Sequence, residues 1–132
     1  MKLASKAFAA GVVLFMICSC ASVPVEPPAP GELRLLSMSL PEPIRANIHH
    51  PVTVKFEAGG DPEIKRACFY LSGDGPYCFK VTDVHYGPPG SFTVMFRSTR
   101  RGSYQIECYA EYIRDGRTWP TKLISSQITV IY

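Results

Sequence analysis

Apolar and polar residues alternate over short runs from Leu33 to the end of the chain. Alternation with a period of two is typical of β-strands that bury one face, and turn residues separate these runs. No helical periodicity of useful length occurs in this region. We therefore predict an all-β domain of about seven strands, at residues 33–40, 52–57, 64–71, 77–81, 91–97, 103–112 and 122–132.

Most of these strands have a clear apolar face, which we expect to form the core. In the first strand the apolar positions shift from Leu33 and Leu35 to Leu36, Met38 and Leu40, which predicts a β-bulge. The other residues predicted to point inward are Val52, Val54, Phe56, Ala67, Phe69, Leu71, Tyr77, Phe79, Val81, Phe92, Val94, Phe96, Tyr104, Ile106, Cys108, Ala110, Ile128 and Val130.

The strand spacing resembles that of immunoglobulin-like domains on bacterial cell surfaces. The sixth predicted strand reads Gly-Ser-Tyr-x-Ile-x-Cys, and an Asp-Gly turn and a long last strand follow it. The resemblance covers residues 33–132 and implies an antiparallel β-sandwich, but no particular function. The second strand has no cysteine and Trp119 lies near the last loop, so the usual bridge between sheets and the usual buried tryptophan are both missing.

The first residues have the layout of a secretory signal peptide. Lys2 and Lys6 give a basic start, residues 7–17 are uninterruptedly apolar, and a small residue then precedes Cys20. A transmembrane helix needs roughly 20 apolar residues, so this run is too short to span a bilayer. Two simple interpretations of this segment are an ordinary cleaved signal and an uncleaved apolar tail.

The sequence Ile17-Cys18-Ser19-Cys20 resembles the lipobox of bacterial lipoproteins. The resemblance implies cleavage after Ser19 and attachment of lipid chains to Cys20, which would hold the protein firmly on a membrane. It divides the chain into a signal peptide (1–19), a lipidated cysteine with a tether (20–32) and the domain (33–132). By the same analogy, Ala21 after the cysteine favours the outer membrane of the bacterial envelope, facing the periplasm or the surface.

The predicted tether is rich in proline. Pro24, Pro27, Pro28 and Pro30 disfavour a helix and favour an extended left-handed conformation. A plain disordered spacer is equally compatible with this composition. On either interpretation the segment is a linker and not a site.

Composition limits the classes of partner. About one hundred residues remain after the tether, which is the size of one domain. Loss of Lys2 and Lys6 from the 14 basic groups leaves 12 basic against 11 acidic groups. A nearly neutral chain gives no electrostatic reason to predict a nucleic-acid partner.

Strand parity predicts how the remaining cysteines pair. Cys68 and Cys78 both lie on the polar side of their strands, and pairing Phe69 with Tyr77 across the hairpin sets them opposite each other. We therefore predict a Cys68–Cys78 disulfide and a reduced, buried Cys108. A Cys68–Cys108 bridge is the alternative, because a bulge would change the parity.

The candidate catalytic chemistry is sparse. His49 and His50 are adjacent and point apart in an extended chain, and only His85 lies elsewhere, so we predict no metal site and no cofactor. Cys108 has apolar neighbours at Ile106 and Ala110, which is typical of a core thiol and not of a nucleophile. We expect a protein without enzymatic activity; an envelope enzyme is the least favoured alternative.

Two surfaces are candidates for binding. Loops 58–63, 83–90 and 113–120 should meet at one end and bring Tyr86, Arg114, Arg117 and Trp119 together, a set suited to a sugar, a peptide or a protein. Simple packing of Trp119 over the edge of the sandwich is the alternative explanation. The first strand starts at this end, so the tether attaches there.

The opposite end carries Arg97, Arg100 and Arg101, which suit an anionic glycan or an acidic partner. A solvated charged loop is the other explanation. The sequence thus favours a lipid-anchored envelope protein that acts as a non-catalytic binding or adhesion module for an envelope protein or a glycan. The main alternative is a structural accessory subunit that adds its edge strand to a partner.

Overall fold

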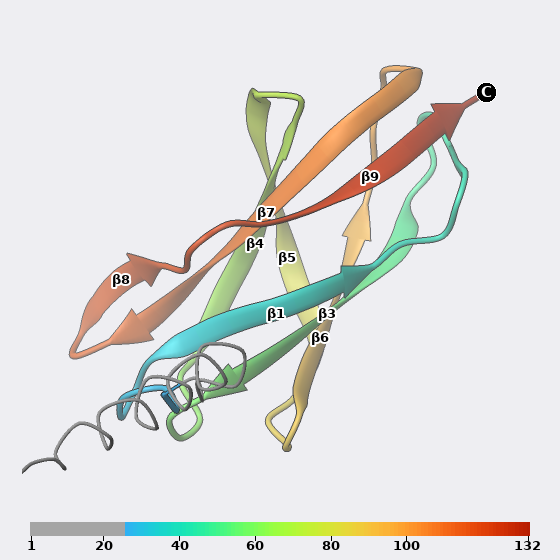
Figure 1. Ribbon diagram of the computed structural model, residues 1–132. Coiled ribbons are helices and arrows are strands. Elements are labelled where there is room, and N and C mark those ends of the chain that lie inside the picture. Colours follow the sequence, from blue (N-terminus) through green and yellow to red (C-terminus); the bar gives the residue numbers. More distant parts are fainter. Residues whose placement is uncertain (1–25) are drawn as a thin grey trace, which may run out of the picture.

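The structure, a computed structural model, describes residues 26–132 (Figure 1). The predicted signal peptide and Cys20 lie outside these residues. The described part is all-β and contains nine strands and no helix. The strands are β1 (Leu33–Ser39), β2 (Ile44–Arg45), β3 (His50–Ala58), β4 (Ile64–Leu71), β5 (Asp74–His85), β6 (Gly90–Phe96), β7 (Gly102–Arg114), β8 (Arg117–Pro120) and β9 (Ile124–Ile131).

The strands form one curled mixed sheet with the order β1-β3-β6-β5-β4-β7-β9-β2, and β8 pairs with β7 beside this path. The sheet changes direction at β5, because the first part of β5 pairs with β4 and its last part pairs with β6. The pairing is antiparallel except between β2 and β9. β1 comes within 8 Å of β9, Cα to Cα, although the two are not hydrogen-bonded neighbours (Figure 1).

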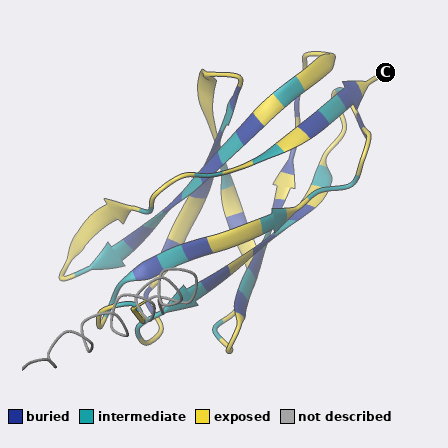
Figure 2. Ribbon diagram, viewed as in Figure 1, coloured by how far each residue is buried: buried dark blue, intermediate teal, exposed yellow. Residues whose placement is uncertain are grey.

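The core lies between the two halves of this curled sheet, and burial alternates along the strands (Figure 2). The Phe96 ring lies 5.0 Å from the Phe69 ring and 5.5 Å from the Phe79 ring, centroid to centroid. The Phe56 and Phe92 rings also pack together, with their centroids 5.9 Å apart. The inward face predicted for β3, β6 and β9 and for most of β4 and β7 is thereby confirmed.

Two residues predicted to point inward are exposed. Leu36 lies in the register shift between Leu35 and Ser37, so the predicted bulge is confirmed, but the bulge turns Leu36 outward. Tyr77 lies at the hairpin end of β5, where the opposing strand also shifts register between Phe69 and Leu71. Its hydroxyl instead donates a hydrogen bond to Asp74 Oδ2 at 2.5 Å.

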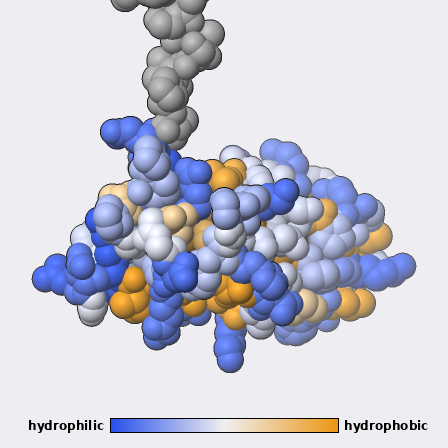
Figure 3. Space-filling view, turned by 90° about the horizontal axis from the view of Figure 1, so that it is seen from below, coloured by the Kyte–Doolittle hydropathy of each residue, from blue (hydrophilic) through white to orange (hydrophobic). Residues whose placement is uncertain are grey.

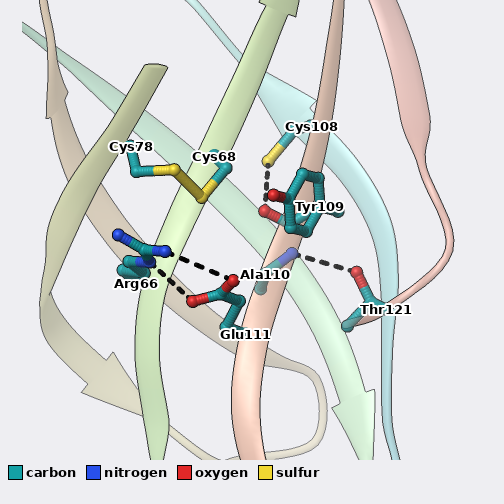
Figure 4. Close-up of a disulfide and its surroundings, with 8 residues drawn as sticks. All are labelled: Arg66, Cys68, Cys78, Cys108, Tyr109, Ala110, Glu111 and Thr121. Carbon is teal, nitrogen blue, oxygen red and sulfur yellow. Dashed lines mark hydrogen bonds and ion pairs between the residues drawn. A yellow bond between two sulfur atoms is a disulfide. The ribbon is translucent and has the colours of Figure 1, made fainter. Parts of the chain in front are cut away.

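The predicted disulfide is confirmed (Figure 4). Cys68 and Cys78 are register partners on β4 and β5, and their sulfur atoms are bonded. Cys68 lies on the outer face and is fully buried there, outside the core cluster. Cys108 is a free thiol in the core, as predicted, and burial raises its pKa to about 12.

The end of the proline-rich segment is bound to the domain. The Gly31 amide donates to the Gly59 carbonyl at 2.6 Å, and the Gly59 amide donates to the Glu32 carbonyl at 2.9 Å. A Cβ atom on Gly59 would lie 2.1 Å from the Ala29 carbonyl oxygen, so only glycine permits this contact. The chain therefore enters the domain at the end that holds the β3–β4 turn, pinned from Ala29 onward.

Candidate functional site

The structure separates the residues predicted to form the first binding cluster. Arg114 and Trp119 line one groove, whereas Tyr86 lines a different one with Leu36 and the prolines of the β5–β6 loop. Tyr86 is held by a hydrogen bond from its hydroxyl to the Pro62 carbonyl at 2.6 Å and by an edge contact with Phe56, and burial raises its pKa. Arg117 is exposed in the β7–β8 hairpin. The four residues thus do not form a single site.

The groove that contains Trp119, which we call the seam groove, lies between β1 and the junction of β8 with β9. Its volume is about 580 Å³. It exists because the curled sheet does not close: β1 is the last strand of the order at one end, and β8 pairs with β7 alone. The residues that line it are Glu32, Leu33, Arg34, Leu35, Tyr112, Arg114, Trp119, Pro120, Thr121, Lys122, Leu123 and Ile124.

Trp119 occupies the seam groove with a fixed orientation. It is the register partner of Tyr112 across the β7–β8 hairpin, and its Nε1–H donates to the Arg114 carbonyl at 3.0 Å. Its exposed fraction is 40%, so a large part of the indole is open to solvent although its polar atom is bonded. The sequence left a binding role and packing over the sheet edge as alternatives for Trp119; the structure shows an indole that is 40% exposed and whose Nε1–H is bonded.

A second groove, of about 410 Å³, lies on the outer face of β4 and β7. The rings of Tyr70 and Tyr109 are 6.1 Å apart there, and burial is the main cause that raises the pKa of Tyr109. Arg66 Nε donates to Glu111 Oε1 at 2.5 Å, which fixes the carboxylate beside the rings (Figure 4). We call this the tyrosine groove.

The sequence analysis did not identify the tyrosine groove, although one signal was present. Tyr70 shares the outer face of β4 with Cys68, and Tyr109 lies on the outer face of β7, so two tyrosines occupy positions that a sandwich normally leaves polar. Their neighbourhood depends on the pairing of β4 with β7, which the alternation pattern alone does not specify.

The arginines of the opposite end have different partners. Arg100 Nη1 donates to Asp74 Oδ2 at 2.5 Å, and its guanidinium lies 5.8 Å from the Tyr104 ring centroid. The Arg101 guanidinium lies 3.5 Å from the Tyr132 ring centroid. Asp74 accepts from both Tyr77 and Arg100, and these bonds lower the pKa of its carboxyl, with the Tyr77 bond as the larger cause. Arg97 is exposed beside Arg100.

Within residues 26–132, no three side chains of the His, Cys, Asp and Glu types converge as a metal site would require. The same stretch contains no helix with the length and apolar character needed to cross a membrane. The chain matches no protein-family model and no curated protein at a significant level.

Proposed function

We propose that this chain is a lipid-anchored protein of the bacterial envelope whose single immunoglobulin-like domain binds an extended segment of another envelope protein, without catalysis. The seam groove is the observation that carries this proposal. The groove places a half-exposed tryptophan between the edges of β1 and β8, neither of which has a hydrogen-bonded neighbour on its outer side among residues 26–132.

The immunoglobulin-like interpretation is supported by the layering of the strands. β1, β3 and β6 form one half of the curled sheet, and β4, β7 and β9 form the other, with the phenylalanine core between them. β5 passes from one half to the other, and β2 pairs with the last strand in parallel. Both features are compatible with a sandwich whose sheets are linked at one side.

The groove suits a peptide in an extended conformation. An edge strand offers unpaired backbone groups that an incoming strand can satisfy, and side-chain pockets beside it supply specificity. Trp119 provides a large, oriented apolar surface of the kind that dominates protein interfaces. Leu33, Leu35 and Tyr112 form the buried floor, and Arg34, Arg114 and Lys122 provide charge at the rim. This interpretation unites the predicted binding module with the alternative of a subunit that uses its edge strand.

A glycan is the second candidate, and the tyrosine groove favours it. Aromatic faces stack on the apolar faces of sugar rings, and the fixed Glu111 carboxylate can accept hydrogen bonds from hydroxyl groups. Apolar side chains reach the surface in separate patches among polar ones on the face that Figure 3 shows.

The choice between the grooves is tested by photo-crosslinking in intact cells. Lys122 lines only the seam groove, and Thr118 lines only the tyrosine groove. A photoreactive amino acid at position 122 should capture one envelope protein as a discrete band, whereas the same group at position 118 should not. Position 95, an exposed methionine on β6, is the control. Equal capture from all three positions, or a discrete band from position 118 alone, would contradict the seam proposal.

The anchor is tested by Cys20→Ala. We expect this variant to lose incorporation of a labelled fatty acid and to leave the membrane fraction, because lipid chains on this sulfur and the adjacent amine supply the membrane affinity. Cys18→Ala is the matched control and should still be labelled. Label retained in Cys20→Ala would refute the proposed anchor.

A further inference from the structure

Three segments meet at the end of the domain opposite Gly31, and we call this end the tip. The Asn47 amide donates to the Ser98 carbonyl at 2.7 Å, which ties the loop after β2 to the β6–β7 turn. The Ala46 amide donates to the Ile131 carbonyl at 2.6 Å, which ties the same loop to the end of β9. The tip is therefore a built surface and not a set of independent loops.

The tip carries an excess of positive charge. Its arginines are Arg45, Arg97, Arg100 and Arg101, and its carboxylates are Asp74 and Glu42. Both carboxylates are engaged: Asp74 with Arg100 and Tyr77, and Glu42 with the Thr129 amide at 3.0 Å. Arg97 and Arg101 have no ion pair within residues 26–132, and Arg45 Nη1 donates only to the Tyr132 carbonyl at 2.7 Å.

Exposed apolar side chains stand directly beside these arginines. Ile48 is 48% exposed in the loop after β2, and Ile131 is exposed as the register partner of Arg45. Tyr132 is 72% exposed and is stacked under Arg101. Exposed apolar groups beside arginine and tyrosine match the boundary between lipid headgroups and acyl chains.

We propose that the tip binds an anionic lipid surface. Ile48 and Ile131 enter the headgroup region, Tyr132 lies at its level, and the guanidinium groups of Arg97 and Arg101 bind lipid phosphates. Arginine suits this contact because its planar fork donates two parallel hydrogen bonds to a phosphate. The charge is complementary, since anionic lipids attract nearby basic residues.

The placement of the tip determines which membrane it meets. The chain enters the domain at Gly31, beside Gly59, and the tip lies at the far end of β1, β7 and β9 (Figure 1). If the anchor proposed above holds the other end, the tip faces away from the anchoring membrane and reaches a second one. This arrangement in trans depends on the proposed anchor, whereas the lipid contact itself does not.

The experiment uses the full chain, added from detergent to preformed vesicles of neutral phosphatidylcholine. After washing, a second population of fluorescent vesicles is offered, made either of phosphatidylcholine alone or of a mixture with phosphatidylglycerol. We expect capture of the anionic vesicles and not of the neutral ones, and capture should weaken as salt screens the charges. Protein lost from the first vesicles would report failure of the anchor; protein retained without capture would report failure of the tip.

Single replacements test which residues of the tip bind the anionic vesicles. Arg97→Ser and Arg101→Ser should each lower the apparent affinity for anionic vesicles about fivefold, and together about 25-fold. Arg117→Ser, which removes an exposed charge at the other end, should have no effect. Ile48→Ser should weaken capture, whereas Leu36→Ser, with a comparable exposed fraction of 46%, should not.

Besides retention without capture, three results would overturn the proposal. The first is capture that does not distinguish anionic from neutral vesicles, and the second is capture that survives the double arginine replacement. The third is capture that Ile48→Ser leaves intact and that soluble polyphosphate abolishes, since the tip would then recognise a phosphate-bearing polymer and not a lipid surface. Circular dichroism of each variant confirms that the fold is retained.

Discussion

Replacement of Phe96 by alanine should lower the free energy of unfolding by about 3 to 5 kcal/mol, which is the usual cost of emptying a buried phenylalanine site. Phe96 is fully buried and touches Phe69 and Phe79, which belong to the opposite half of the curled sheet. Its ring therefore joins the two halves, and neighbouring strands cannot close the space without moving the sheet. Urea unfolding followed by circular dichroism measures the loss.

Met95 provides the matched control on the same strand. Its side chain points to the outer face and is exposed, so Met95→Ala should change the free energy of unfolding by no more than about 0.5 kcal/mol. If Phe96→Ala cost less than about 1 kcal/mol, the ring would not be part of a closed core, and the layered arrangement would be wrong.

Removal of the Cys68–Cys78 disulfide should lower the free energy of unfolding by about 2 to 3 kcal/mol. The bridge closes a short hairpin loop, with a sequence separation of 10, and so restricts the unfolded chain. The double variant Cys68→Ala/Cys78→Ala is the right comparison, because a single replacement would leave a reactive partner thiol. Thermal and urea unfolding with and without reductant provide the measurement.

The reductant is the control for this experiment. It should destabilise the unmodified protein by a similar amount and leave the double variant unchanged. Cys108 should not interfere, because its pKa of about 12 keeps the thiol protonated near neutral pH and its burial blocks thiol–disulfide exchange. Recovery of a Cys108-containing bridge by peptide mapping would contradict the assignment.

The local patterns of this sequence predict most of its strands because each strand buries one face. Val52, Val54 and Phe56 alternate with polar residues, and their burial follows from that period alone. The register of Cys68 with Cys78 was also predictable, since a short hairpin connection fixes the pairing of its two strands. Tyr77 was misplaced because alternation shows which face a residue occupies but not where the core ends.

The short strand β2 and the two grooves depend on contacts between segments that are distant in the sequence. β2 has two residues, too few to show a period, and it exists through its pairing with β9. The seam groove follows from the approach of β1 to β8 and β9, and the separation of Tyr86 from Trp119 follows from the same curl of the sheet. No stretch of sequence contains this curvature, so Trp119 could be chosen as a binding residue but its neighbours could not be.

The parallel pairing of β2 with β9 has a mechanical consequence. A pull on the chain at Gly31 first loads β1, which is paired with β3; once β1 yields, an opposite pull at the end of β9 draws β2 and β9 past each other along their own axes. Hydrogen bonds loaded in this direction share the tension and must break together, whereas strands peeled apart sideways lose one bond at a time. Tension along the domain would therefore load the two residue pairs of β2 and β9 in shear.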